Sequence, residues 1–125
     1  MAKILIIDDE ETVRFSLYEM LMENGHVVDT AVDGEDGLAK ASSGAFDLVI
    51  ADLIMPRKAG IEMIQEIRSL FPELPVLAIS GGARMRGVDP LLEAETAGAN
   101  AVLRKPFSCG ELLVRVEALL KRRVP

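Results

Sequence analysis

Five short apolar runs constrain the fold of this chain more than any other feature of its sequence. They are rich in isoleucine, valine and leucine, and polar residues do not interrupt them. Unbroken apolar runs of this kind are typical of strands that are buried on both faces, as in a parallel sheet. The predicted strands cover residues 4–7, 27–28, 48–51, 76–79 and 101–103, of which the run at 27–28 is the weakest.

Longer amphipathic stretches separate these runs and predict helices. In the last stretch, Leu112, Val116 and Leu119 recur at the spacing that places apolar side chains on one face of a helix. The predicted helices cover residues 10–24, 34–43, 60–71, 90–97 and 109–122. Strands that alternate with helices predict an α/β fold, with a doubly wound parallel sheet, helices on both faces and right-handed crossovers.

Capping residues support several of these helix ends. Asp33 precedes the second predicted helix as an N-cap, and Ser108 with Glu111 has the spacing of a capping box. Glycine follows three of the predicted helices, at positions 25, 44 and 98, where a glycine in the left-handed conformation often ends a helix.

Length and charge exclude several classes of protein. The 125 residues fit one domain, residues 1–125, without an internal repeat or a linker. The net charge of −6 disfavours direct binding of nucleic acid through a basic surface. The single cysteine, Cys109, cannot form an internal disulfide, and no apolar run approaches the roughly 20 residues of a membrane span. We therefore expect a cytoplasmic protein that does not bind membranes.

Polar and charged residues follow four of the five predicted strands. Asp8 and Asp9 come after the first strand, Asp52 after the third, Ser80 after the fourth and Lys105 after the fifth. Ligands bind beyond the carboxyl ends of the strands in open α/β sheets. We therefore expect these five side chains to converge at one edge of the sheet.

These residue types are suited to binding a metal ion and accepting a phosphoryl group. Neighbouring carboxylates repel one another unless a cation lies between them, and hard oxygen ligands suit Mg²⁺. An aspartate can act as a nucleophile toward phosphorus and form an aspartyl-phosphate. Lys105 would then supply positive charge to the phosphoryl oxygens, and Ser80 would donate a hydrogen bond to one of them.

With these pieces in this order, the sequence resembles the receiver domains of two-component response regulators over essentially its whole length. The resemblance implies a flavodoxin-like (βα)5 three-layer sandwich whose five-stranded parallel sheet has the strand order 2-1-3-4-5. The matching pieces are Asp8-Asp9, Asp52 with Met55-Pro56, Ser80-Gly81, Gly98-Ala99 and Lys105-Pro106-Phe107.

The resemblance also implies a role for each matching residue. Asp52 would be the phosphoacceptor, Lys105 would pair with the phosphoryl group, and Ser80 would be the switch hydroxyl that moves to meet it. The Lys105–Pro106 peptide bond would be cis, which is a deliberate feature where it occurs.

The metal site implied by the resemblance is a Mg²⁺ site made of oxygen ligands. Asp9 and Asp52 would bind the ion directly, together with the backbone carbonyl of Ile54. Asp8 would act mainly through a bound water.

By the same resemblance, the chain is a phosphorylation-dependent signalling switch of a two-component system or phosphorelay. A sensor histidine kinase or a phosphotransfer protein would donate the phosphoryl group to Asp52. A downstream target protein would bind the face formed by the fourth helix, the fifth strand and the fifth helix. Enzymatic activity would be limited to self-phosphorylation from a phosphodonor and slow autodephosphorylation.

Other functions fit the residues less well. A flavin site needs a phosphate-binding loop after the first strand, but residues 8–11 are all acidic. An aspartyl-phosphate hydrolase carries a second aspartate two residues after its nucleophile, where this chain has Ile54. A degenerate receiver that acts only as a protein-interaction module stays an alternative, as does the receiver piece of a larger regulator or hybrid kinase.

Two features differ from the family's usual pattern, and a third residue has no predicted role in the site. Val102 occupies the position where the family usually has an aromatic switch residue, and a valine cannot swing as tyrosine does. The segment between Ser80 and Gly98 is longer than usual and is predicted to be a mobile, basic loop. His26, the one histidine, is predicted to be an ordinary surface residue near the start of a strand.

The apolar side chain two positions after Asp52 generates a testable prediction. We expect Ile54 to hinder the water that hydrolyses an aspartyl-phosphate, so that Ile54→Asn loses its phosphate faster than the unmodified chain. The measurement is the rate of phosphate release after the phosphodonor has been removed. Equal rates for the two proteins would contradict the prediction.

Overall fold

The computed structural model describes residues 2–53, 60–80, 95 and 97–121. Within these ranges the chain forms five strands and four helices, which confirms the predicted strands and four of the predicted helices. The helix predicted over residues 90–97 lies mostly outside the described residues. The elements are β1 Lys3–Ile7, α1 Glu11–Glu23, β2 Val27–Ala31, α2 Gly34–Ser43, β3 Leu48–Asp52, α3 Gly60–Leu70, β4 Val76–Ser80, β5 Ala101–Arg104 and α5 Cys109–Lys121.

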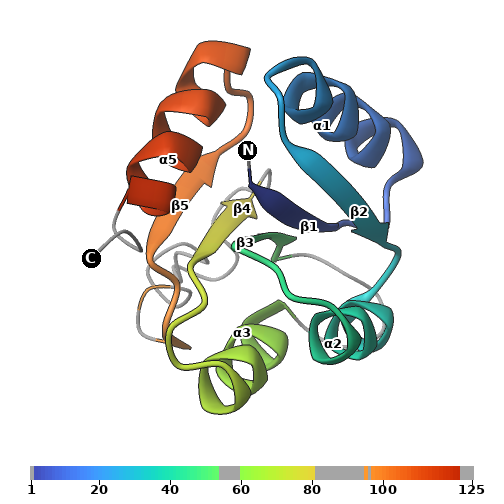
Figure 1. Cartoon of the computed structure of the whole chain (residues 1–125), viewed down its shortest axis with the longest axis vertical. Helices are drawn as coiled ribbons and strands as arrows, with labels where there is room; N and C mark the ends of the chain where they lie inside the picture. The colour runs from blue at the N-terminus through green and yellow to red at the C-terminus, as the bar shows by residue number, and fades with distance from the viewer. Residues whose placement is uncertain (1, 54–59, 81–94, 96, 122–125) are drawn as a thin grey trace, which may run out of the picture.

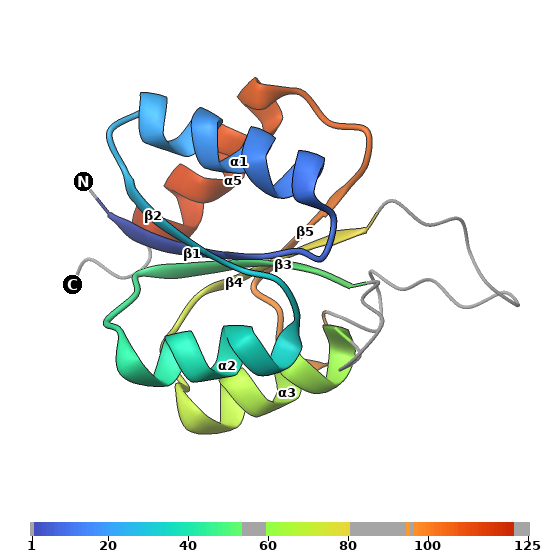
Figure 2. The same cartoon turned by 90° about the vertical axis from the view of Figure 1, so that its right-hand side faces the viewer.

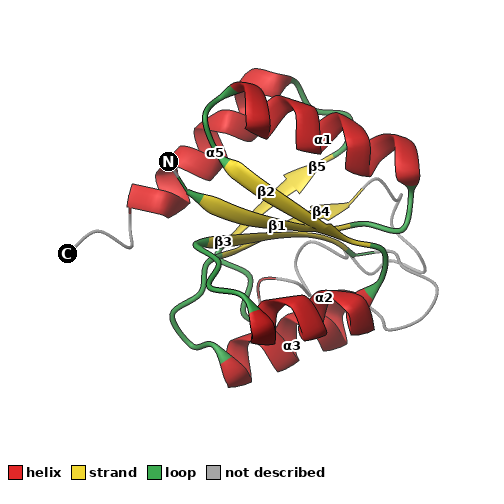
Figure 3. Cartoon of the chain, turned by 45° about the vertical axis from the view of Figure 1, so that its right-hand side comes forward, coloured by secondary structure: helices red, strands yellow, loops and turns green. Residues whose placement is uncertain are grey.

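The strands form one parallel sheet in the order β2-β1-β3-β4-β5, which confirms the predicted doubly wound topology (Figure 1). Helices α1 and α5 cover one face of the sheet, and α2 and α3 cover the other (Figures 2 and 3). The order reverses between β1 and β3, so the carboxyl ends of these two neighbouring strands meet where such folds bind ligands.

Alternate residues of each central strand enter two different apolar layers. In β1, Leu5 and Ile7 pack toward Met63 and Ile64 of α3, whereas Ile4 and Ile6 pack into the layer that contains Leu17 of α1. Strands β3 and β4 are buried along their whole length. Burial on both faces is the reason that these strands read as unbroken apolar runs in the sequence.

The weak second run belongs to an edge strand. Strand β2 pairs only with β1, and its burial alternates between exposed and partly buried until Ala31. Its outer side faces solvent, so Asp29 and Thr30 are tolerated within the strand. The run at 27–28 is therefore only the apolar beginning of a five-residue strand.

The predicted helix caps are formed by the expected side chains. The Asp33 carboxylate accepts a hydrogen bond from the Asp36 amide at 2.8 Å, and the Ser108 hydroxyl accepts one from the Glu111 amide at 3.0 Å. Gly25, which follows α1, has a φ of 88°, as expected for a glycine that ends a helix. Gly98 also has a positive φ, of 123°, a conformation that favours glycine. Gly44 has a φ of −118°, so its position after α2 does not require glycine for that reason.

The prediction that His26 is an ordinary surface residue is wrong. Its side chain is buried, and its Nδ1 accepts a hydrogen bond from the Ala2 amide at 3.3 Å. Its Nε2 lies 3.3 Å from the Glu117 carboxylate of α5 but forms no hydrogen bond with any described residue. The sequence around His26 gives no sign that a helix 91 residues further along the chain lies against it.

Within the described ranges, no helix combines the length and the apolar character that a bilayer crossing requires.

The contact between α2 and β1 generates a prediction about stability. A Cβ atom on Gly37 would lie 2.4 Å from Cδ1 and 2.9 Å from Cγ1 of Ile7, which is fully buried in the core. We expect Gly37→Ala to lower the free energy of unfolding by about 1–3 kcal/mol, as overpacking of a core does.

Gly110→Ala in α5 is the matched control. The nearest atom to its added Cβ is the Ser108 hydroxyl at 3.7 Å, an ordinary contact. Alanine in a helix is up to about 1 kcal/mol more favourable than glycine, so this variant should be as stable as the parent or more stable. Urea unfolding of both variants measures the difference, and a similar response at the two sites would contradict the packing argument.

Candidate functional site

Asp8 and Asp9 lie in the short turn between β1 and α1. The Asp8 amide donates a hydrogen bond to the Ala31 carbonyl of β2 at 3.1 Å, which continues the pairing of the two strands by one residue. Its carboxylate accepts a hydrogen bond from the Glu10 amide at 2.9 Å. Asp8 is only 1% exposed, whereas Asp9 is exposed to solvent.

Asp52 is the last residue of β3 and lies beside Asp8. Ile7 is paired with Ala51 in the parallel register, so the residues that follow them meet at the same edge of the sheet. Asp52 is also buried. The backbone of the next residue, Leu53, is held in place by a 3.0 Å hydrogen bond from its amide to the Ile79 carbonyl of β4.

The three aspartates form one acidic cluster. Asp8, Asp9 and Asp52 each offer a carboxylate oxygen, and these oxygens lie within 4.8 Å of one another. Oxygen ligands at this spacing, two of them on buried residues and one exposed to water, suit a hard divalent cation that keeps part of its water shell. The donor set therefore fits Mg²⁺.

Lys105 supplies the positive charge next to the cluster. Its Nζ lies 3.6 Å from an Asp52 carboxylate oxygen and 3.9 Å from an Asp8 carboxylate oxygen. Its backbone amide donates a hydrogen bond to the Ser80 carbonyl at 2.8 Å, which extends the pairing of β4 with β5. The Lys105–Pro106 peptide bond is cis, as the resemblance implied.

The other residues predicted for the site are Ser80, Ile54 and Val102. Ser80 ends β4 next to these side chains and is fully buried, so it faces protein rather than solvent. Ile54 lies outside the described residues, as does most of the segment predicted to be a basic loop. Val102 is partly buried in β5 and packs against the core layer on the α2–α3 side.

Arg14 is a residue of the site that the sequence reasoning missed. Its guanidinium reaches back from α1 and donates a 2.8 Å hydrogen bond to the Asp8 backbone carbonyl. The only signal in the sequence is an arginine in the first turns of a helix whose start is otherwise acidic. That signal does not say which carbonyl the side chain will reach.

Burial dominates the electrostatics of Asp8. The pKa of the Asp8 carboxyl is raised from 3.8 to about 6, mainly by burial and to a smaller extent by the negative charges of Asp52 and Asp9. The hydrogen bond from the Glu10 amide and the positive charge of Lys105 act in the opposite direction. The chain without a cation therefore holds a carboxylate that is costly to ionise, and a bound cation would relieve that cost.

Comparison with known proteins gives a consistent match over most of the chain. The family model described as the response regulator receiver domain matches residues 4–117. A response regulator MprA of Mycolicibacterium vanbaalenii is 39% identical over 127 aligned positions, which cover 98% of this chain and 52% of the relative. The chain thus spans about half the length of the curated relatives it matches.

Solved structures show the same similarity in three dimensions. The chemotaxis protein CheY4 of Vibrio cholerae has a TM-score of 0.85 at 32% identity, with 95% of this chain and 98% of that chain covered. A two-component response regulator of Clostridium difficile has a TM-score of 0.90 at 26% identity, with both chains fully covered.

The raised pKa of Asp8 predicts how stability depends on pH. The folded state holds this proton more tightly than the unfolded state, so stability is lost as pH rises from about 4 through 6. A shift from 3.8 to about 6 corresponds to a loss on the order of 3 kcal/mol at pH 7. In the presence of a chelator, we therefore expect Asp8→Asn to be more stable than the parent at pH 7.5.

Urea unfolding at a series of pH values between 4 and 7.5 measures this effect. The advantage of Asp8→Asn should shrink toward pH 4, where the carboxyl is protonated in the folded state and close to its ordinary pKa of 3.8 in the unfolded state. Glu19→Gln removes an exposed carboxylate of α1 and serves as the control. An Asp8→Asn advantage that does not change with pH would contradict the assignment.

Proposed function

The chain belongs to the family of response regulator receiver domains, and we propose that it works as a phosphorylation-dependent switch whose phosphoacceptor is Asp52. Its enzymatic activity is proposed to be limited to self-phosphorylation from a phosphodonor and slow autodephosphorylation. The observation that carries the assignment of Asp52 is its position: it is buried at the end of β3, within the acidic cluster and 3.6 Å from the Lys105 ammonium.

In the proposed reaction, an Asp52 carboxylate oxygen attacks the phosphorus of a phosphohistidine on a partner protein. A phosphorus–oxygen bond forms and the phosphorus–nitrogen bond breaks, and the departing imidazole nitrogen takes up a proton. Asp52 needs no base for this step, because its carboxylate is the nucleophile once it is ionised. Lys105 stabilises the negative charge that spreads over the phosphoryl oxygens.

Asp8 and Asp9 are proposed to complete the site by binding Mg²⁺ together with Asp52 and the backbone carbonyl of Ile54. When bound, Mg²⁺ supplies positive charge beside the transferring phosphoryl group. The spacing of the three carboxylates supports this assignment.

Ser80 and Lys105 are proposed to convert phosphorylation into a change of shape. They come from neighbouring strands that are joined by the hydrogen bond between the Lys105 amide and the Ser80 carbonyl. A phosphoryl group that draws the Ser80 hydroxyl and the Lys105 ammonium toward Asp52 would favour one arrangement of β4, β5 and the segments that follow them. Phosphorylation shifts the equilibrium between two conformations of the chain only as far as the contacts of the phosphoryl group are more favourable in one conformation than in the other.

The proposed downstream partner binds the face formed by the fourth helix, β5 and α5, as in the family. A cleft of about 300 Å³ on this face is lined by Val102 of β5 and by Arg115 and Leu119 of α5, among others. Val102 replaces the usual aromatic residue, so we propose that the movement of Ser80 and of the strand ends carries the signal here.

The proposed phosphodonor is a sensor histidine kinase or a phosphotransfer protein. A groove of about 350 Å³ lies between α1 and the segment after β5, and Lys105 forms part of its lining. Val13, Met20 and Phe107 give it an apolar surface beside the phosphoryl-accepting site. A partner surface that docks in this groove would hold its phosphohistidine within reach of Asp52.

We propose a cytoplasmic location, and we propose that the chain acts either alone or as the receiver part of a larger regulator. Its relatives named MprA are about twice as long as the matched region, which favours the second arrangement. A degenerate receiver is disfavoured, because the acceptor, the acidic pair and the lysine are all present in one place.

Labelling with a small phosphodonor tests the assignment of Asp52. Phosphoramidate carries a phosphorus–nitrogen bond like that of phosphohistidine, and with Mg²⁺ it should add one phosphoryl group that is stable in acid and labile in base. We expect no labelling of Asp52→Asn and none of the parent chain in excess chelator. The measurement is the mass of the intact protein before and after treatment with base.

Asp29→Asn is the matched control, since it removes an exposed aspartate of β2. It should be labelled at the rate of the parent chain. Labelling of Asp52→Asn to the same extent as the parent would show that another residue is the acceptor.

A further inference from the structure

Arg14 lies near the start of α1, among acidic residues. It is the fourth residue of α1, whose start carries Glu10 and Glu11. The positive end of a helix dipole favours acidic side chains and disfavours basic ones in the first turn and its neighbourhood. The cost is small, because Glu10 and Glu11 lie four and three residues before Arg14 and favour a cation there. The role of Arg14 is therefore decided by the specific interaction that its side chain makes.

The interaction is the hydrogen bond to the β1–α1 turn. An Arg14 guanidinium nitrogen donates to the Asp8 backbone carbonyl at 2.8 Å, and the Arg14 amide donates to the Glu10 carbonyl at 2.9 Å. Arg14 thus holds the turn through both its side chain and its backbone. A bond from a charged donor is about twice as strong as one between neutral groups.

The turn is fixed on both sides of Asp9 but not at Asp9 itself. Asp8 is held by its amide, its carboxylate and its carbonyl, through Ala31, Glu10 and Arg14 respectively. Asp9 forms no hydrogen bond or ion pair with the residues that the structure describes. The backbone from which the exposed Asp9 side chain extends is therefore positioned in part by the Asp8–Asp9 peptide group, whose oxygen accepts the Arg14 hydrogen bond.

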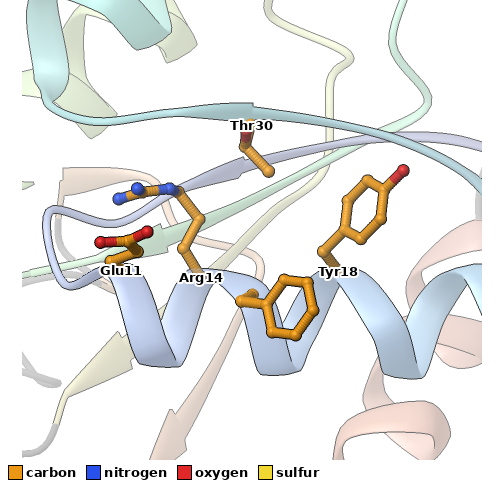
Figure 4. A pocket seen from close by; sticks show the side chains of 5 residues that line it. Glu11, Arg14, Tyr18 and Thr30 are labelled. Atoms are coloured by element: carbon orange, nitrogen blue, oxygen red, sulfur yellow. The ribbon is translucent and has the colours of Figure 1, made fainter.

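The contact between Arg14 and the residues of the acidic cluster is the hydrogen bond to the Asp8 backbone carbonyl. Figure 4 shows the Arg14 side chain extending along α1 toward the turn and above Glu11, while Tyr18 lies further along the helix. The same side chains, with Phe15 and Thr30, line a cleft of about 280 Å³ between α1 and β2.

We propose that Arg14 is a positioning residue for the metal site: it holds the Asp8 carbonyl so that the Asp9 carboxylate points toward Asp8 and Asp52. The proposal rests on the proposed function, because it takes the acidic cluster to be a Mg²⁺ site. Loss of the Arg14 contact frees the peptide group that carries Asp9. Mg²⁺ then has to order the turn as it binds, and its affinity falls.

The test compares Arg14→Met, which keeps the bulk of the side chain but removes its donors, with Arg14→Lys, which keeps one charged donor. Phe15→Ala is the control, because Phe15 is the next residue, is exposed and lines the same cleft without contacting the turn. Mg²⁺ affinity is measured by following backbone amide resonances of the whole chain during a titration with no phosphodonor present. Far-ultraviolet circular dichroism shows that each variant is folded under these conditions.

We expect Arg14→Met to weaken Mg²⁺ binding by roughly tenfold, the lower end of the effect of removing a residue that orients a metal ligand. Arg14→Lys should fall between Arg14→Met and the parent, and Phe15→Ala should bind within about twofold of the parent. Phosphoramidate labelling adds a second readout. The Mg²⁺ concentration for half-maximal labelling of Arg14→Met should rise by the same factor, while the rate at saturating Mg²⁺ returns to that of the parent.

The outcomes are separable. A folded Arg14→Met that binds Mg²⁺ as tightly as the parent overturns the positioning role, and so does a labelling rate that saturating Mg²⁺ does not restore. A purely structural role would change the urea midpoint and leave the Mg²⁺ affinity of the folded protein unchanged. If Arg14→Met does not fold, the Mg²⁺ affinity and the labelling rate of Arg14→Lys test the positioning role instead, and a parent-like Mg²⁺ affinity of Arg14→Lys overturns it. If the parent chain itself binds no Mg²⁺, the proposed function fails and the role of Arg14 fails with it.

Discussion

Repulsion among three carboxylates is the constraint on which the rest of this structure depends. Asp8, Asp9 and Asp52 bring their oxygens within 4.8 Å of one another, and two of the three residues are buried. The Asp8 carboxyl is costly to ionise there, and three like charges would separate in a flexible chain. Lys105 offsets part of the repulsion, but at 3.6 Å and 3.9 Å its single charge is shared between Asp52 and Asp8. A further cation bound between these carboxylates would reduce the repulsion that remains.

The two-layered core provides the rigidity that keeps these charges together. Strands β1, β3 and β4 are almost wholly buried, so their carboxyl ends cannot move apart without disturbing apolar packing on both faces. Backbone hydrogen bonds then extend the sheet by one residue beyond β1 and β5, into Asp8 and Lys105. The acidic cluster thus lies at the carboxyl-terminal edge of a rigid sheet. Burial of the apolar side chains of the strands supplies the free energy that holds the like charges together.

Most of the fold and most of the site could be predicted because both follow from local patterns. Unbroken apolar runs indicate buried parallel strands, and the residues that come after such strands must meet at one edge. That reasoning brings Asp8, Asp52 and Lys105 together without any knowledge of distances. It also explains why β2 was the least clear strand, because an edge strand has one solvent-exposed side and carries Asp29 and Thr30.

The predictions that failed or were missing concern contacts between distant segments. His26 looks like a surface residue beside Gly25, but α5 brings Glu117 to within 3.3 Å of its ring and the Ala2 amide bonds to it. Arg14 has no role in the site predicted from the sequence, and only the folded turn places the Asp8 carbonyl within its reach. In both cases the side chain is polar and its partner is a backbone group or a residue of another element, which no periodicity reveals.

By itself, the sequence determined the order of strands and helices, the caps of α2 and α5, and the residues that stand at the strand ends. These depend on side-chain type and on spacing along the chain, which are local properties. The tertiary structure alone decided how closely the three carboxylates approach, how deeply Asp8 and Ser80 are buried and which carbonyl Arg14 holds. These depend on the packing of segments that are distant in sequence, because burial and distance are set by all the neighbours of a residue at once.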